Sequence, residues 1–357
     1  MMGDLATPRG ATGDAADSRL EALCAWLADV LPTPMTGLAP ASTDASFRRY
    51  FRVDLADTIA VPDQGARAST LIVMDAPPPR ENCRPYVEAA KLLAAAGVHA
   101  PAVVAMDLER GFLLLSDLGS RTYLSALNPT TAPELYGDAS TALVRWQLAS
   151  RDGCLPQYDE VLLRREIDLF ADWYVARHLG VALTVAQKAK LDRVCRAVLD
   201  NNLAQSQVFV HRDYHSRNLM VAEPNPGVLD FQDAVYGPIT YDLVSLLRDA
   251  YIEWEEEQQI DWAVRYWQKA RAVALPVSAD FGVFWRDFEW MGVQRQLKVL
   301  GIFARLFHRD GKDGYLKEMP RVMRYLRGAC ARYRELAPLL RLLDELEQRQ
   351  PVAGYTF

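Results

Sequence analysis

In the segment VFVHRDYHSRNLMV, residues 208–221, a short apolar run is followed by two histidines, an aspartate and an asparagine. It belongs to a longer stretch, 207–234, whose pattern predicts a strand, a loop, a second strand, a turn and a third strand. Asp213 stands five residues before Asn218, and Asp230 stands twelve residues after that asparagine. Each lies at a predicted strand end or in the connecting loop, so the three side chains can meet over one site.

The three polar residues have the chemistry of a site for phosphoryl transfer. Two carboxylates and a carboxamide are hard oxygen ligands, which suit Mg²⁺ better than Zn²⁺. Phosphoryl transfer uses one aspartate to orient the attacking hydroxyl, while an asparagine and a second aspartate hold metal against the phosphate oxygens. The plain alternative is that these residues merely end buried strands, but the full set at this spacing is improbable by accident.

The first 118 residues predict a small lobe of mixed helices and antiparallel strands. Ser18 can cap a helix through LEALCAWLADVL, and the region before it, 1–17, is interpreted as a disordered tail. The stretch 32–46 is rich in turn residues. The regular elements expected after it are strands at 47–55 and 69–75, a helix at 85–97, and strands at 101–108 and 111–119.

Beyond Gly119 the chain is dominated by amphipathic patterns. Helices are expected at 131–150, 160–179, 184–202, 240–251, 255–273, 281–307 and 316–346. The predicted fold class is α+β, with a small antiparallel-sheet N-lobe at 18–118 and a large, mostly helical C-lobe at 119–357. Two lobes with polar residues on an inserted β segment favour a binding cleft between them.

Composition excludes several classes of protein. The 357 residues carry a net charge of −6 without a basic block, so nucleic acid is not an expected partner. The five cysteines never form a C-x-x-C pair, which argues against a disulfide scaffold or a zinc ribbon. We find no apolar run of membrane-spanning length, no secretory leader and no evident obligate protein partner, so a cytoplasmic protein is expected.

Two linked motifs resemble a known family. The stretch H-R-D-Y-H-S-R-N at 211–218 resembles the H-R-D-x-x-x-x-N catalytic loop of protein kinases, and its second histidine brings it closer to the aminoglycoside phosphotransferase family of small-molecule kinases. The stretch LDFQDAVYGPITYDL at 229–243 is similar to that family's IDF/IDW-x-x-A segment and downstream Asp-Leu. The resemblance covers about residues 36–310 and implies a bilobal, protein-kinase-like fold that uses ATP and Mg²⁺.

The resemblance also assigns roles to the residues of the loop. Asp213 is expected to be the catalytic base or the group that positions the hydroxyl, and Asn218 and Asp230 are expected to be metal ligands. His215 is a second catalytic candidate, in contact with either the γ-phosphate or the acceptor. His211 is expected to support the loop through hydrogen bonds.

A further residue, Asp242 on the next helix, is expected to brace the same loop.

The N-lobe departs from the kinase pattern. Met74 stands where protein kinases carry the lysine of their third strand, and the loop STDAS at 42–46 contains no G-x-G-x-x-G. Ser46 of this loop is a candidate nucleotide contact. We expect Arg48 or Arg49 to supply the missing positive charge, and only one of them to reach the nucleotide, because adjacent strand residues face opposite ways. A solvated, charged strand is the alternative.

Two other N-lobe segments have positional counterparts in kinases. The stretch LLLSDLG at 113–119 matches the hinge, where backbone groups around Ser116 to Leu118 are expected to bind adenine. Glu88 occupies the position of the acidic partner of the kinase lysine. It is expected either to pair with Arg48 or Arg49 or to face water.

A resemblance to one subgroup of the family indicates which class of acceptor to expect. The stretches STDASFRRYFR, LIVMDAPPPRENCRPYVE, SDLGSRTYL and FVHRDYHSRNLMV resemble the bacterial anomeric kinases of N-acetylmuramate and N-acetylglucosamine. This implies phosphorylation of the C1 hydroxyl to a sugar 1-phosphate in peptidoglycan recycling. A hemiacetal hydroxyl is more acidic than an ordinary alcohol, so one carboxylate can suffice as base. Sugar contacts are conceivable for four residues, although core packing is the plainer interpretation of the tryptophans: Arg165, Trp173, Trp290 and Arg295.

Other functions stay open from sequence. One alternative is a phosphotransferase for another small hydroxyl acceptor, an aminoglycoside or another sugar. A nucleotide-binding regulator without catalysis would explain Met74 and the missing glycine loop, although it would have no need of Asp213. A metal-dependent phosphoesterase around His211, Asp213 and His215 would need more metal ligands than the sequence offers.

Overall fold

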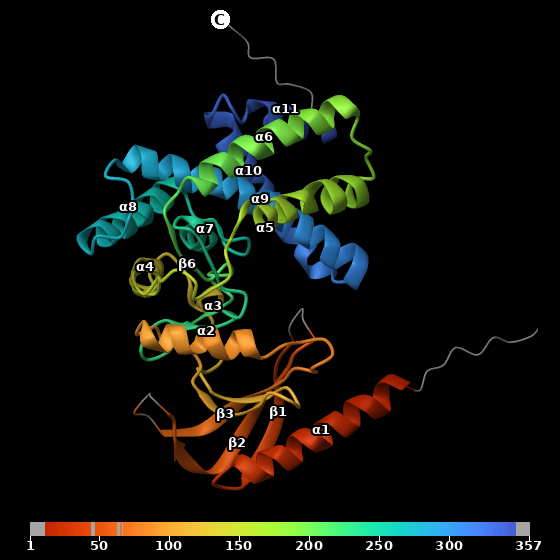
Figure 1. Cartoon of the computed structure of the whole chain (residues 1–357), viewed down its shortest axis with the longest axis vertical. Helices are drawn as coiled ribbons and strands as arrows, with labels where there is room; N and C mark the ends of the chain where they lie inside the picture. The colour runs from red at the N-terminus through yellow and green to blue at the C-terminus, as the bar shows by residue number, and fades with distance from the viewer. Residues whose placement is uncertain (1–10, 44–46, 63–64, 66, 348–357) are drawn as a thin grey trace, which may run out of the picture. The chain divides into compact units, whose positions relative to one another are not determined.

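The computed structural model describes residues 11–43, 47–62, 65 and 67–347, and Figure 1 shows the path of the chain. The chain divides into two compact units. The first comprises Met1–Ala94 and Ala100–Gly119, and the second comprises Ala95–His99 and Ser120–Phe357. The division falls after Gly119, beside the lobe boundary expected from sequence.

The first unit is built on a five-stranded antiparallel sheet with strand order β1-β2-β3-β5-β4. The strands are β1 (Met35–Thr43), β2 (Arg49–Ala60), β3 (Arg67–Asp75), β4 (Val103–Asp107) and β5 (Phe112–Ser116), and the helices are α1 (Ala11–Val30) and α2 (Arg84–Ala95). Leu23, Trp26 and Leu27 of α1 pack with Val53 and Val73 of the sheet in one apolar core. Burial of this helix face holds α1 on the sheet.

Strand β1 was not predicted, because 32–46 was interpreted as turn-rich. Its sequence, MTGLAPAST, contains glycine and proline and lacks the alternation of a half-buried strand. The strand lies at the edge of the sheet, where proline is tolerated because one side of the backbone needs no partner. Register shifts beside Gly37 and Pro40 accommodate the two residues.

The predicted start of α1 was also wrong. The helix begins at Ala11, and Ser18 lies inside it instead of capping it. Extending a formed helix adds one hydrogen bond per residue, and alanine has the highest helix propensity, so the Ala-containing segment 11–17 continues the helix backwards. Residues 1–10 of the expected tail lie outside the described part of the chain.

The second unit is mostly helical and contains two small antiparallel ribbons. Its helices are α3 (Tyr123–Ala126), α4 (Ala132–Leu148), α5 (Glu160–Leu169), the π-helix η1 (Phe170–His178), α6 (Val185–Leu203), α7 (Tyr241–Leu247), α8 (Glu256–Ala272), α9 (Phe281–Asp310), the 3₁₀-helix η2 (Asp313–Glu318), α10 (Met319–Arg332) and α11 (Ala337–Leu346). The ribbons pair β6 (Gln207–Val210) with β9 (Val235–Pro238), and β7 (Leu219–Met220) with β8 (Gly227–Val228).

Helix α9 is the central helix of this unit. Its thirty residues pack against α5, α6, α7, α10 and η1, and most of its side chains are buried. A Cβ at Gly301 would overlap the backbone of Leu169, so α9 and α5 cross at a distance that only glycine permits. This close crossing brings the side chains of both helices towards the loop that follows β6.

Two predicted helices are interrupted. The pattern at 316–346 forms η2, α10 and α11, because the backbone is extended at Tyr333 and Pro338 lies in the first turn of α11. Pro338 has no backbone N–H and cannot bond back to Arg334 as a continued helix would require, but it is tolerated in the first turn of a new helix. The pattern at 160–179 forms α5 and then continues as the π-helix η1.

The predicted fold class is confirmed: a small antiparallel sheet precedes a larger, mostly helical part. Among the described helices, none combines the length and the apolar character needed to cross a bilayer.

Candidate catalytic site

The loop after β6 is held by His211 at its start. His211 is 1% exposed, its Nε2 lies 3.0 Å from the Leu229 carbonyl, and its Nδ1 accepts from the Asp213 N–H at 3.3 Å. Burial lowers the pKa of His211 to about 4, against the raising effect of Asp213, so the imidazole is neutral. These contacts confirm the prediction that His211 supports the loop through hydrogen bonds.

Asp242 braces the same loop from the first turn of α7. It is fully buried, and its two oxygens accept from the His211 N–H at 2.6 Å and from the Arg212 N–H at 2.9 Å. Burial raises the pKa of Asp242 to about 7, although both hydrogen bonds oppose the rise. The predicted bracing role is confirmed.

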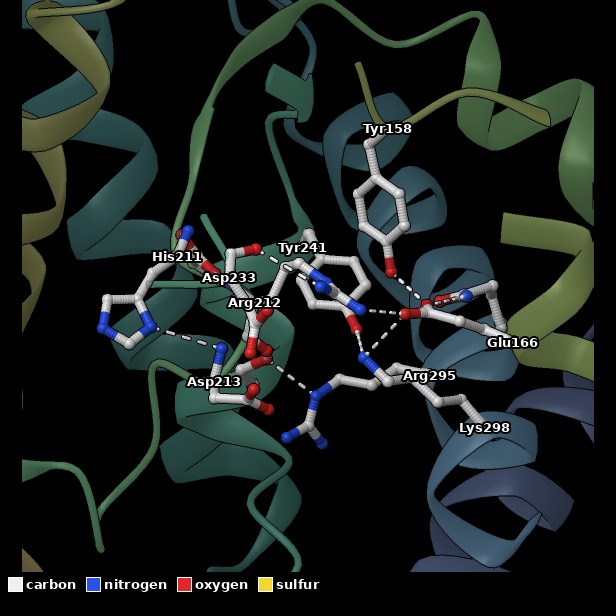
Figure 2. Close-up of polar contacts among 12 residues, drawn as sticks. Tyr158, Glu166, His211, Arg212, Asp213, Asp233, Tyr241, Arg295 and Lys298 are labelled. Carbon is white, nitrogen blue, oxygen red and sulfur yellow. Dashed lines mark hydrogen bonds and ion pairs between the residues drawn. The ribbon is translucent and has the colours of Figure 1, made fainter. Parts of the chain in front are cut away.

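Arg212 connects the loop to the helices behind it. Its φ of 76° is left-handed, which is costly for a residue with a Cβ and needs support from its surroundings. The guanidinium pairs with Glu166 through Nη2 and donates to the Asp233 carbonyl at 3.3 Å, as Figure 2 shows. The Arg212 carbonyl accepts from the Ser245 hydroxyl at 3.3 Å. Arg212 is therefore fixed at both its backbone and its side chain.

Asp213 follows directly and is partly exposed. Burial raises the pKa of its carboxyl group, but the positive charges of Lys298, His215 and Arg212 outweigh that effect and lower the pKa below its ordinary value. Figure 2 shows Arg295 and Lys298 on the same side of the loop as this carboxylate. An ionised, partly exposed carboxylate at this position is suited to accept a proton from a hydroxyl group.

Asn218 and Asp230 come together beside Asp213. The Asn218 Nδ2 donates to the Asp213 carbonyl at 3.0 Å and to Asp230 Oδ2 at 3.2 Å, while Gln232 Nε2 donates to Asp230 Oδ1 at 2.7 Å. The described residues include no group of three or more His, Cys, Asp or Glu side chains that could hold a metal ion. An amide and a carboxylate fit a hard divalent ion that takes its remaining ligands from water and phosphate.

His215 follows Asp213 by two residues. Its N–H donates to the Asp213 carbonyl at 3.0 Å, and its ring meets Tyr251 edge-on at a centroid distance of 5.4 Å. Burial lowers its pKa, against the effect of Asp249. The neighbouring Arg217 is exposed and lies over the Tyr251 ring at 4.8 Å. The structure thus places His215 beside Asp213, and a catalytic role for either residue stays a prediction.

A buried group behind the loop was missed from sequence. Glu166 of α5 contacts Arg212 and Lys298 of α9 and accepts hydrogen bonds from Tyr158 and Gln294. A signal was present, because Glu166 falls within the apolar stripe of its helix, which contains the buried residues Leu163, Ile167 and Phe170. A charge on such a stripe indicates a buried partner.

The two arginines of the first unit have different carboxylate partners. Arg48 Nη2 lies 3.0 Å from Glu81, whereas Arg49 Nε donates to Asp75 at 2.9 Å. Asp75 is fully buried and also accepts from Arg19 Nε at 2.9 Å. The two arginines thus pair with different residues, and contact with a nucleotide by either one stays a prediction.

Other expectations for the first unit have mixed outcomes. Met74 is fully buried in the sheet and supplies no cation. Of the two alternatives for Glu88, exposure to water is confirmed and pairing with Arg48 or Arg49 is not, because its side chain is 67% exposed and pairs with Lys91. Ser46 lies outside the described residues.

The predicted hinge is a well-bonded segment. Ser116 is buried, its N–H donates to the Ala102 carbonyl at 2.9 Å, and its hydroxyl accepts from the Ala102 N–H at 2.9 Å. Arg52 Nε donates to Asp117 at 2.6 Å. Leu118 follows in a partly exposed position. The Ser116 N–H is thus already engaged, and adenine recognition by Ser116 and Leu118 stays a prediction.

The four residues considered as sugar contacts differ in how far they are buried. Trp290 is 2% exposed and packs edge-on against Tyr333, which confirms the core interpretation. Arg165 is exposed and Trp173 is partly exposed. Arg295 is buried, and its Nε donates at 2.7 Å to Ser245, whose hydroxyl donates to the Arg212 carbonyl in the loop after β6.

Comparison with known proteins gives matches over most of the chain. The model of the phosphotransferase enzyme family matches residues 37–288. The chain is 52% identical over 342 residues to an N-acetylmuramate/N-acetylglucosamine kinase of Pseudomonas aeruginosa, covering 93% of this chain and 98% of that protein. It is 49% identical over 337 residues to a protein of the same name from Neisseria meningitidis serogroup B, covering 93% and 97%.

Solved structures share the fold at low sequence identity. Amicoumacin kinase hAmiN, in complex with AMP-PNP, Ca²⁺ and Ami, superposes with a TM-score of 0.59 at 13% identity, covering 89% of this chain and 96% of that one. ADP-bound aminoglycoside phosphotransferase APH(2'')-Ib gives a TM-score of 0.52 at 14% identity, covering 86% and 97%. These likenesses show the fold.

Proposed function

The chain belongs to the phosphotransferase enzyme family, and on that premise we propose that it is an ATP-dependent kinase of the C1 hydroxyl of N-acetylmuramate and N-acetylglucosamine. The observation that carries the proposal is the meeting of Asp213, Asn218 and Asp230 at one site, in a chain 52% identical to a kinase named for these two sugars. The product would be a sugar 1-phosphate, which returns cell-wall sugars to nucleotide-sugar synthesis.

Asp213 performs the proton transfer in this proposal. The sugar C1 oxygen bonds to the γ-phosphorus of ATP, its proton passes to the Asp213 carboxylate, and the bond between the γ-phosphorus and the departing ADP oxygen breaks. The lowered pKa of Asp213 keeps it ionised and ready to accept a hydrogen bond from the hydroxyl. A weak base suffices because a hemiacetal hydroxyl is comparatively acidic and the transition state has little covalent bonding to the nucleophile.

Asn218 and Asp230 would hold Mg²⁺ in the same site. When bound, the ion would neutralise charge on the phosphate oxygens. The Asn218 Nδ2 N–H groups donate to the Asp213 carbonyl at 3.0 Å and to Asp230 at 3.2 Å, so the amide oxygen would be the Asn218 atom that holds the ion. His215 would contact the γ-phosphate or the sugar beside it.

The first unit would bind the nucleotide. Arg48 or Arg49 would contact phosphate, with Ser46 in the preceding loop and Ser116 and Leu118 at the hinge near adenine. Use of ATP as the donor is consistent with a cytoplasmic location, which is part of this proposal.

The test is acceptor-dependent release of ADP. The protein is mixed with ATP, Mg²⁺ and a panel containing both amino sugars, other sugars and aminoglycosides. We expect ADP only with the two N-acetylated amino sugars, because the chain most resembles kinases of that name among the relatives described. Asp213→Asn should abolish ADP release and leave ATP affinity largely unchanged, since the base acts in the transition state.

Each other outcome contradicts the proposal in a distinct way. ADP release with aminoglycosides alone would identify a different acceptor, and no acceptor-dependent ADP would favour a nucleotide-binding regulator. Phosphate release from monoesters without ATP would indicate a phosphoesterase.

A further inference from the structure

Glu166 is the centre of a buried charge network that joins α5 and α9 to the catalytic loop, as Figure 2 shows. The residue is 5% exposed. Its Oε1 pairs with Arg212 and lies 3.1 Å from Lys298 Nζ, while its Oε2 accepts from the Tyr158 hydroxyl and from Gln294 Nε2 at 3.2 Å. Both carboxylate oxygens are thus satisfied within the protein, which leaves this side chain no part in contacting substrate.

A network of this kind is an inefficient way to stabilise a fold. Burying ions removes their hydration, and the mutual attraction of the ions often does no more than offset that loss. Apolar side chains of similar volume frequently stabilise a core equally well. The network is therefore better explained by the elements that it connects than by its contribution to the free energy of unfolding.

The first connection runs through Arg212. Its side chain is held by Glu166, its N–H by Asp242 at 2.9 Å, and its carbonyl by Ser245 at 3.3 Å. The residue has a left-handed φ of 76°, which these contacts maintain. Arg212 and Asp213 share a peptide bond, so the orientation of one determines the direction in which the other projects.

The second connection runs through α9. Lys298 donates to the Tyr241 hydroxyl at 2.9 Å and pairs with Glu166. Burial lowers the pKa of Lys298, but the Glu166 carboxylate outweighs this and keeps the ammonium charged. One turn earlier, Arg295 donates to Ser245 at 2.7 Å, and Ser245 in turn donates to the Arg212 carbonyl. Helix α9 thus reaches the loop through two neighbouring side chains.

We propose that Glu166 and Lys298 are positioning residues, which fix the direction of Asp213 through Arg212 and so align it with the acceptor hydroxyl. The inference rests on the proposed kinase function. It predicts that the network affects the rate of phosphoryl transfer, and not only the stability of the fold.

The principal variant is Glu166→Gln, which keeps the side-chain shape and removes the charge. The half-buried Arg212 and the buried Lys298 would then be two cations without their shared counter-charge, and Arg212 would lose its anchor. We expect kcat to fall about 100-fold, the effect of displacing a catalytic group by about 1 Å. The KM values for ATP and sugar should change less than about threefold, because neither substrate contacts Glu166.

The chain provides a matched control in Glu289 of α9. Glu289 is fully buried and contacts Arg248, Arg332 and Tyr333, so it also binds two cations and a tyrosine hydroxyl. None of these residues belongs to the proposed site. Glu289→Gln should lower the melting temperature about as much as Glu166→Gln, with kcat close to that of the wild type.

A double variant, Glu166→Gln with Lys298→Met, separates the role in positioning from the role in stability. It removes one negative and one positive charge, so the melting temperature should recover relative to Glu166→Gln. The value of kcat should stay low because Arg212 remains without its anchor. Recovery of kcat together with the melting temperature would overturn the proposal, as would equal kcat losses in Glu166→Gln and Glu289→Gln.

Hydrogen exchange of the segment 211–218 gives a readout that needs no substrate. Exchange should be faster in Glu166→Gln than in Glu289→Gln, and equal protection would overturn the positioning role. A wild-type protein without acceptor-dependent ADP release would instead overturn the proposed function. An active wild type with an equally active Glu166→Gln would overturn only the positioning role.

Discussion

Asp213 is held by its main chain, while its carboxylate stays available. Its N–H donates to His211 Nδ1 at 3.3 Å, and its carbonyl accepts from the His215 N–H and from Asn218 Nδ2, both at 3.0 Å. Within the described part of the chain, no hydrogen bond to its carboxylate was found. At the scale of single residues, hydrogen bonds therefore hold the Asp213 backbone, and its ionised carboxylate would be available to a substrate.

The low pKa of His211 predicts a pH-dependent contribution to stability. Its pKa is about 4 in the folded protein and about 6.5 in the unfolded chain. The unfolded chain thus binds more protons between these values, so the contribution is present above about pH 6.5 and is lost as pH falls to about 4. The loss should approach about 3 kcal/mol, from 1.36 kcal/mol per pKa unit.

The variant His211→Gln tests this, because its amide can replace the bond to Leu229 but cannot titrate. Chemical denaturation of both proteins between pH 4 and 7 gives the difference in free energy of unfolding. That difference should shrink or reverse as pH falls, and a difference independent of pH would contradict a neutral, buried His211. Asp242 titrates in the same window and is present in both proteins, so its effect cancels to first order.

The sequence alone was sufficient to identify those candidate site residues that lie close together along the chain. Asp213, Asn218, Asp230 and Asp242 lie within a short span, and their spacing could be compared with a known motif. Glu166 precedes the loop by more than 40 residues, at a separation that local patterns do not report. Its place in the network depends on how two helices cross, which the sequence does not state.

At the scale of elements, the crossing of α9 and α5 determines whether the charge network around Glu166 can form. Gly301 of α9 meets the backbone of Leu169, where a Cβ would overlap. Glu166 lies three residues before Leu169, and Lys298 lies three residues before Gly301. The close crossing therefore determines whether Glu166 and Lys298 can meet.

Substitution Gly301→Ala should force the two helices apart. Overpacking of this kind costs about 1–3 kcal/mol in free energy of unfolding, and kcat should fall because Glu166 and Lys298 separate. Gly328, inside α10, has open space where a Cβ would lie. Gly328→Ala should be neutral or stabilising by up to about 1 kcal/mol, the helix-propensity difference.

Denaturant unfolding and kcat of both variants check this prediction. A Gly301→Ala protein as stable and as active as Gly328→Ala would show that the crossing distance is unimportant.

The elements that escaped prediction have physical causes in common. Strand β1 carries Pro40, which an edge position tolerates, and the predicted helix at 316–346 is interrupted at Tyr333, before α11 begins with Pro338 in its first turn. Local patterns were interpreted correctly where one face of an element is continuously apolar. They failed where an edge strand or a helix junction is stabilised by neighbours far along the chain.

At the scale of the whole molecule, the chain comprises an antiparallel-sheet unit and a helical unit. The candidate catalytic groups all belong to the second unit, and the proposed nucleotide contacts belong to the first. From sequence, a lobe boundary near Gly119 is expected because amphipathic helical patterns dominate beyond that residue. The identity of the phosphate contact was not predictable, since Met74 replaces the residue that would have marked it.

The central claim is that this kinase phosphorylates the anomeric oxygen. Phosphorus NMR of the product made from ATP and N-acetylmuramate measures the linkage directly. We predict one phosphomonoester signal coupled to the anomeric proton, as a sugar 1-phosphate requires. A product whose phosphorus couples to the protons at C6 instead, as a 6-phosphate would, contradicts the account.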